Sequence, residues 1–230
     1  MIRLFPYLLR RTAWVAMAVL LLMACTSNDY DTGDGKLSHY RADFVDAYTN
    51  SNASFVKAMT DDGDSLVFSA PLKAKWATTP DSAYRALLYY SKVDEKLQPR
   101  SMVSVLVPNI RPISKVKTMY NDPVKMISAW RSRNGRYVNL CLGFVTGTNE
   151  DDESKHSVGM VCDTLLQHED GSKHLQLKFY HSRNGMPEYY TTKLYFSIPL
   201  KNNPYHLGTG DSLSVAVNTY EGWVTKTFTY

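Results

Sequence analysis

The cysteine at position 25 lies in a context that predicts a covalent modification. The segment 22–25 reads Leu-Met-Ala-Cys, which has the spacing of a bacterial lipobox, in which the cysteine sulfur accepts a diacylglycerol. Twelve consecutive apolar residues, 13–24, precede Cys25, and a head with three arginines precedes them. Such a run fits the core of an export signal and is shorter than the roughly 20 residues of a membrane span. We interpret residues 1–24 as a lipoprotein signal peptide; the alternative is a plain secretory signal that leaves Cys25 a free thiol.

Two further cysteines, Cys141 and Cys162, could form a disulfide in an exported protein. If the strands around them form a hairpin, alignment of the apolar faces pairs Leu142 with Met160. That register places Cys162 on the core face and Cys141 on the opposite face, where the two side chains diverge. We therefore expect two free thiols. A shift of one residue would bring the thiols together, so the disulfide stays open as an alternative.

The remaining groups with chemical potential show no catalytic or metal-binding spacing. The six histidines are His39, His156, His168, His174, His181 and His206. No two of them have the i, i+2 or i, i+4 spacing by which a strand or a helix presents a metal. The acidic clusters 61–64 and 150–153 do not continue into a calcium-binding loop, and Ser157 beside His156 has no acid at a readable spacing. We expect no metal, no cofactor, no catalytic residue and no enzymatic activity, although carboxylate pairs for glycoside hydrolysis depend on the fold.

Aromatic residues are the other group that could contact a ligand. The chain has 16 tyrosines, and Trp76, Trp130, Trp223 and Tyr189 are candidates for exposed contacts. Neighbouring residues of a strand point to opposite faces, so one tyrosine of an adjacent pair such as Tyr89-Tyr90 or Tyr189-Tyr190 should face outward. An outward tyrosine can stack on a sugar ring or anchor a protein partner, and it can equally belong to a cross-strand pair that stabilises a sheet.

The elements that would position these residues are strands. Apolar residues alternate with a period of two throughout the chain, and Asp-Gly and Asn-Gly dipeptides punctuate them as hairpin turns. Five strands are expected at 38–48, 53–60, 65–70, 84–92 and 101–108, and seven at 124–131, 136–146, 156–163, 173–181, 188–198, 212–219 and 222–229. A single short helical piece is expected near Ala74 to Trp76.

This pattern predicts an all-β protein of two domains. Residues 37–117 would form a small OB-like Greek-key barrel, and residues 118–230 a seven-stranded antiparallel β-sandwich. The boundary is placed at the proline-containing stretch 108–112 and the polar residues after it. Two copies of Ser-Arg-Asn-Gly, at 132–135 and 182–185, predict hairpins with shared turn chemistry.

The net charge of the chain indicates which classes of partner it can bind. The formal net charge is +4, but without the three arginines of residues 1–24 only 23 basic side chains face 22 acidic ones. Such a balance lacks the basic stripe that nucleic acids require, so we expect no nucleic-acid partner. Residues 25–36 are polar and acidic and predict a flexible tether. We therefore expect the membrane itself, reached through the lipid on Cys25, to be one partner.

Several stretches together resemble a known family. They are Tyr137-Val138-Asn139-Leu140, His156-Ser157-Val158-Gly159, and the run from Tyr180-His181 through Asn184-Gly185 and Tyr189-Tyr190 to Tyr195–Leu200. With the lipobox and the acidic tether they resemble the NigD-like lipoproteins of Bacteroidetes over essentially the whole chain. The resemblance implies an N-terminal OB-like domain and a C-terminal β-sandwich. It also implies a bacteriocin-associated immunity or accessory role.

We therefore expect a lipid-anchored protein of the cell envelope, located at the outer membrane. Exposure at the cell surface is an open alternative. It would act as a non-catalytic binding or accessory module whose partner is an envelope protein or a glycan. Two alternatives stay open: a surface glycan-binding lipoprotein and a pilin-like structural subunit. The sequence identifies neither the ligand, nor the oligomeric state, nor the membrane leaflet that carries the anchor.

Overall fold

The computed structural model describes residues 40–93, 96–148, 155–201 and 203–230. The predicted signal peptide, the lipidation site Cys25 and the tether lie outside these residues, as does the acidic cluster 150–153. Within the described part, no helix has the length and apolar character needed to cross a membrane. Residues Arg41–Tyr230 form one compact unit.

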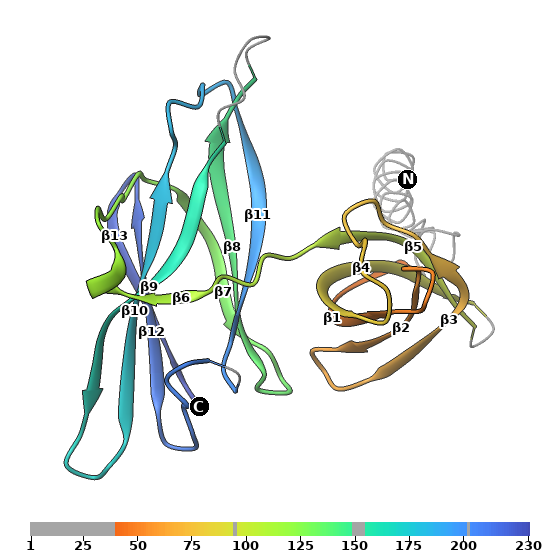
Figure 1. The fold of residues 1–230 in the computed structure, drawn as a ribbon, viewed down its shortest axis with the longest axis horizontal. Coiled ribbons are helices and arrows are strands. Elements are labelled where there is room, and N and C mark those ends of the chain that lie inside the picture. Colours follow the sequence, from red (N-terminus) through yellow and green to blue (C-terminus); the bar gives the residue numbers. More distant parts are fainter. Residues whose placement is uncertain (1–39, 94–95, 149–154, 202) are drawn as a thin grey trace, which may run out of the picture. The chain divides into compact units, whose positions relative to one another are not determined.

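The first domain is a closed five-stranded barrel, as expected for an OB-like fold (Figure 1). Its strands are β1 (Tyr40–Thr49), β2 (Phe55–Thr60), β3 (Ser65–Leu72), β4 (Ala83–Val93) and β5 (Lys96–Ser104). They follow the order β1-β2-β3-β5-β4, in which β3 and β5 are parallel and the pairs β1–β2, β2–β3 and β4–β5 are antiparallel. Alternate residues of β4, Ala86, Leu88 and Tyr90, are buried in the barrel core.

The second domain is a β-sandwich of two sheets. Its strands are β6 (Ile110–Pro112), β7 (Lys125–Arg131), β8 (Tyr137–Thr146), β9 (Ser157–Gln167), β10 (Lys173–Ser182), β11 (Tyr190–Pro199), β12 (Ser212–Thr219) and β13 (Gly222–Thr229). One sheet has the order β13-β12-β10-β9-β6 and the other the order β11-β8-β7. All seven expected strands are present. In addition, β6 is an eighth strand, and the pairs β6–β9 and β10–β12 are parallel.

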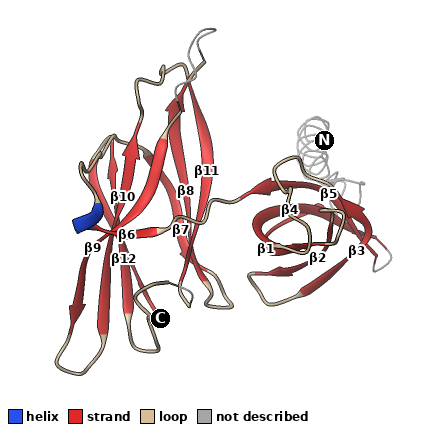
Figure 2. Cartoon of the chain, viewed as in Figure 1, coloured by secondary structure: helices blue, strands red, loops and turns tan. Residues whose placement is uncertain are grey.

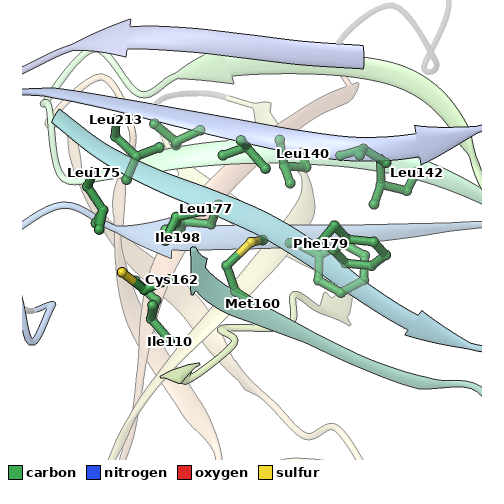
Figure 3. Close-up of a cluster of buried hydrophobic side chains, with 14 of the residues drawn as sticks. Ile110, Leu140, Leu142, Met160, Cys162, Leu175, Leu177, Phe179, Ile198 and Leu213 are labelled. Atoms are coloured by element: carbon green, nitrogen blue, oxygen red, sulfur yellow. The ribbon is translucent and has the colours of Figure 1, made fainter. Parts of the chain in front are cut away.

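The sandwich core lies between the two sheets and follows the period of two in each strand. Leu140 and Leu142 of β8 face Leu177 and Phe179 of β10, and Met160 of β9 fills the space beside them (Figure 3). All five side chains are at most 2% exposed, so each contributes close to its full hydrophobic free energy.

The expected hairpin between the two cysteine-bearing strands is wrong. β8 pairs with β7 and β11, whereas β9 pairs with β6 and β10, so Cys141 and Cys162 lie in different sheets. Both are free and buried. The expected faces are nevertheless correct, because Cys162 belongs to the core between the sheets and Cys141 lies on the other face of β8 from Leu140. Burial raises the pKa of the Cys141 thiol.

Two local expectations differ from the structure. The short helix near Ala74 to Trp76 is wrong: this segment forms a turn in which the Ala77 amide donates to the carbonyl of Ala74, 3.1 Å away. The helical turn found in the described residues is instead η1 (Ile113–Lys115) (blue in Figure 2). The sandwich also begins before the expected boundary at 117/118, since β6 at Ile110 pairs with β9.

The two Ser-Arg-Asn-Gly turns share the chemistry that their sequence predicts. In each, the serine hydroxyl donates to the asparagine side-chain oxygen, at 2.9 Å for Ser132–Asn134 and 2.8 Å for Ser182–Asn184. Each turn ends in a glycine with positive φ, a conformation that glycine adopts at low cost. The asparagine amides bind different neighbours: Asn134 donates to the carbonyl of Thr60, and Asn184 donates to that of Lys155.

Candidate functional site

The chain between β6 and β7 crosses the outer face of the five-stranded sheet. β6 pairs with β9, with Arg111 beside Val161 on the face opposite to the buried Ile110 and Met160. After η1, the carbonyl of Tyr120 accepts a hydrogen bond from the amide of His181, on the side of β10 away from β9. Residues 113–119 must therefore pass over β9 and β10, and we call them the crossing segment.

A cleft of about 880 Å³ lies between this crossing segment and the sheet. It is lined by Pro108, Asn109, Arg111, Lys115, Val116, Lys117, Thr118, Tyr120, His156, Ser157, Val158, Gly159, Met160, Val161 and Tyr180. Its volume falls within the range of sites for small ligands. Gly159 of β9 helps to keep the floor open, because a Cβ atom there would meet only Cβ of Tyr180, 3.9 Å away.

The cleft is basic. Arg111, Lys115 and Lys117 are exposed at its surface, and none of its lining residues is acidic. Among the described residues, none of these three cations takes part in a salt bridge. Nearby cations are paired instead: Lys178 lies 2.9 Å from Asp163, and Arg183 forms an ion pair with Glu188.

Two tyrosines form an aromatic corner in the cleft. Tyr120 of the chain leaving the crossing segment packs edge to face on Tyr180 of β10, with ring centroids 6.0 Å apart and planes at 88°. Tyr120 is 47% exposed. An edge-to-face pair leaves part of a ring available to a ligand, while its packing fixes the ring orientation.

A histidine pair adjoins the cleft, and one of its members, His156, lines it. His156 Nδ1 lies 2.9 Å from His181 Nε2, and His181 Nδ1 lies 2.8 Å from the carbonyl of Asp122. Because a carbonyl only accepts, His181 carries its proton on Nδ1, and neutral His156 must then donate from Nδ1 to His181. His156 Nε2 is left as a buried acceptor with no partner in the described structure. Burial is the main cause that lowers the pKa of both histidines below 6.5.

This pair does not form a nucleophile with its base. The Ser157 hydroxyl lies 2.8 Å from the side-chain nitrogen of Asn184, which donates to it, while His156 Nδ1 faces His181. Across the described ranges, no group of three or more histidine, cysteine or acidic residues is arranged to hold a metal ion. The arrangement can therefore bind and orient a ligand through the cations, the tyrosines and the polar groups of the cleft.

A second polar cluster surrounds Arg85 of β4, whose side chain is 2% exposed. Its guanidinium donates to Asp61 at 2.7 Å, to Ser197 of β11 at 2.9 Å and to Asn139 of β8 at 3.2 Å. It also stacks on the ring of Tyr137, 4.0 Å from the ring centroid. The cluster links strands of the barrel and the sandwich inside one compact unit, so its hydrogen bonds serve cohesion.

A second carboxylate completes this charge balance. Asp46 of β1 lies 3.6 Å from Arg85 and 2.6 Å from Arg136, and it accepts a hydrogen bond from the Tyr137 hydroxyl at 2.9 Å. Two arginines thus face two aspartates once Asp61 is included. Burial, followed by the charge of Asp46, raises the pKa of Tyr137 to about 12.

The four aromatic residues predicted from the sequence do not form a common site. Trp76 packs on Phe55 and Tyr84 in the barrel, and Trp130 packs on Phe44. Trp223 of β13 and Tyr189 before β11 are 50% and 69% exposed. None of the four lines the cleft.

The expectation that adjacent tyrosines face opposite sides holds for one pair. Tyr89 is 38% exposed and Tyr90 is 3% exposed, as a strand requires. Tyr189 and Tyr190 are both exposed, because Tyr189 precedes β11 and so is not bound by its alternation.

A second hollow of about 650 Å³ lies beside the edge strands β7 and β13. Its lining includes two lysines, Lys125 and Lys226, but also the carboxylate of Glu221. Its lining has two basic residues and one acidic residue, against three basic and no acidic residues in the cleft, and we use it below as a reference surface.

Sequence reasoning missed the cleft because residues 108–123 were interpreted as a join between domains. One available signal was the β9–β10 hairpin: counting outward from the Asp170-Gly171 turn pairs residue 158 with residue 182, and a bulge between Gln176 and Leu177 shifts the observed partner of Ser182 by one residue to Ser157. That count would have brought His156 close to His181. The pairing of Asn121 with His181 has no comparable local signal.

Comparisons with known proteins agree with this architecture. A family model described as the NigD-like C-terminal beta sandwich domain matches residues 109–230. A NigD-like immunity protein from Bacteroides caccae is 21% identical, with a TM-score of 0.60, and the match covers 81% of this chain and 91% of that chain. A toxin-related protein from Parabacteroides distasonis is 18% identical, with a TM-score of 0.60, over 83% and 93% of the two chains.

A third solved structure carries a name that bears on location. It is a protein from Bacteroides fragilis named as a candidate lipoprotein, 13% identical with a TM-score of 0.53, and the match covers 82% of this chain and 96% of that chain. At such identities the likeness establishes the shared fold. No curated protein matches this chain.

Proposed function

The chain belongs to the NigD-like family, and from that premise we propose that it is a lipid-anchored accessory or immunity protein of the cell envelope, which acts by binding. The names of the solved relatives, an immunity protein and a toxin-related protein, support the role. The lipobox that ends in Cys25 supports the anchor, as does the lipoprotein name of the Bacteroides fragilis relative.

One observation supports binding above all others, namely the cleft under the crossing segment. It combines an open floor at Gly159, three cations without acidic partners among the described residues, and the exposed Tyr120 packed on Tyr180 of the sheet. Binding sites typically join a preformed hollow with a few placed polar groups. The pairing of β13 with β12 favours a sandwich that completes its own sheet over a subunit that receives a strand from another chain.

The experiment is to close the cleft without unfolding the protein. Gly159→Leu adds a side chain on the open floor, at a residue whose φ is ordinary and whose Cβ position is free of close contacts. Gly208→Leu is the matched control, because Gly208 also has an ordinary φ and open space, and it lies outside the cleft lining. The chain from Thr26 onward would be screened on an array of acidic and neutral oligosaccharides.

We expect ligands found with the unchanged chain to lose about tenfold or more in affinity for Gly159→Leu, a loss that corresponds to roughly 1.4 kcal/mol. Gly208→Leu should bind them as the unchanged chain does. The proposal is wrong if every ligand binds Gly159→Leu as tightly as the unchanged chain.

A further inference from the structure

The positive charge of the cleft has no evident role in stabilising the fold. Lys178 and Arg183 on the same sheet are neutralised by Asp163 and Glu188, as is usual for a protein surface. Within the part of the chain that the structure describes, Arg111, Lys115 and Lys117 have no such partner. Three like charges around one hollow repel one another and attract an anion.

The aromatic corner and the polar rim restrict the kind of anion. The exposed ring of Tyr120 offers an apolar face, and Asn109, Thr118 and Ser157 offer hydrogen-bonding groups beside it. A sugar ring presents an apolar C–H face and hydroxyl groups around its edge, so it matches both features. A volume of about 880 Å³ accommodates a few such rings rather than a protein segment with a large interface.

We propose that the cleft binds an acidic saccharide, meaning a short chain of sugar rings that carries carboxylate, sulfate or phosphate groups. This inference rests on the proposed binding function and specifies its ligand. The anionic groups lie against Arg111, Lys115 and Lys117, and a ring stacks on Tyr120. Because the three cations are exposed, the affinity decreases as salt screens them.

Isothermal titration of the chain from Thr26 onward tests the proposal with four hexamers: a heparin-derived sulfated saccharide, oligogalacturonate, cellohexaose and oligothymidylate. A sugar monophosphate, glucose 6-phosphate, separates phosphate from sulfate and carboxylate recognition. We expect at least one acidic saccharide to bind at least about tenfold more tightly than cellohexaose and oligothymidylate, with an affinity that falls as salt is raised.

The matched variants are two double substitutions that remove the same charge from the two hollows. Lys115→Ala/Lys117→Ala should weaken acidic-saccharide binding about tenfold, because it removes two exposed positive charges that would face the anion. Lys125→Ala/Lys226→Ala, in the reference hollow, should change it less than about twofold. Tyr120→Ala should also weaken binding, because it removes the ring on which the sugar would stack.

Three outcomes overturn the inference. Equal losses in both lysine doubles would show that binding follows net charge alone. Tight binding of oligothymidylate would show that any polyanion is accepted. Tight binding of cellohexaose that Gly159→Leu abolishes would mean that the cleft binds a neutral ligand, in which case the proposed function stands and the ligand class is wrong.

Discussion

His156 and His181 fix one another in a single protonation pattern. His181 Nε2 accepts the proton of His156 Nδ1, so a proton added to His181 would face the N–H of its neighbour. The buried lone pair on His156 Nε2 has no donor in the described structure. Both features favour neutral histidines, in agreement with the lowered pKa of each.

The sign of the resulting pH dependence follows from linkage. The pKa of each histidine is lowered on folding, so the unfolded chain binds more protons below the ordinary value of 6.5. Stability is therefore complete above pH 6.5 and decreases as the pH falls toward the lowered folded values. We predict a smaller free energy of unfolding at pH 5 than at pH 7, measured by urea unfolding.

Substitution of His156 should reduce that slope. His156→Gln retains a donor for His181 Nε2 but removes one titrating group from the buried pair. The control is His168→Gln, in the exposed turn between β9 and β10, which should keep the slope of the unchanged protein. Identical slopes in all three proteins would exclude the histidine pair as the source.

At the scale of elements, β4 is tied to β8 and β11 through one buried cation. Removal of Arg85 leaves Asp61 and the buried Asn139 and Ser197 without their shared donor. Because breaking a buried ion pair leaves an uncompensated charge, we predict that Arg85→Met lowers the free energy of unfolding by about 3 kcal/mol or more.

The reference for this prediction is an exposed pair. Arg133 lies 3.5 Å from Asp62, with side chains 83% and 53% exposed, and Arg133→Met should cost at most about 1 kcal/mol. Urea unfolding of both variants provides the comparison. Losses of equal size would show that the buried cluster contributes no more than a surface pair.

The elements also show where sequence reasoning succeeds. Strands of six or more residues leave a clear alternation, and the structure has a strand at each of the twelve predicted places. The largest error is at β5 (Lys96–Ser104), which begins and ends several residues before the predicted range 101–108. β6 has three residues, one of them Pro112, so it has no period to detect, and its place is decided by pairing with β9. The prediction of a short helix near Ala74 was wrong because this segment forms a single turn, closed by a hydrogen bond from the Ala77 amide to the Ala74 carbonyl.

The candidate site was largely beyond prediction for a related reason. Arg111, Lys115 and Tyr120 come together with Ser157 and Tyr180 only because the crossing segment passes over two strands that follow it in the chain. That path depends on long-range pairing at both ends, at Ile110 and at Asn121, which leaves no local pattern. From the sequence we predicted tryptophans as ligand contacts, but two of them, Trp76 and Trp130, pack against other aromatic rings.

At the scale of the whole molecule, the account requires a lipid anchor on Cys25. Two acyl chains on a glycerol anchor a protein stably, whereas a single chain is marginal. We predict that Cys25→Ser abolishes labelling by an alkyne analogue of palmitate and moves the protein from the membrane fraction to the soluble fraction. Cys141→Ala should leave both readouts unchanged, because this thiol is buried in the sandwich. Retained labelling in Cys25→Ser would refute the anchor.

We propose above all that this protein binds its ligand in the cleft under the crossing segment. The most direct test is a two-dimensional amide spectrum of the chain from Thr26 onward, recorded during titration with the acidic saccharide that binds most tightly. The account predicts shifts concentrated in residues 109–120, 157–161 and 180. Shifts concentrated instead in the barrel or around Trp223 would contradict it.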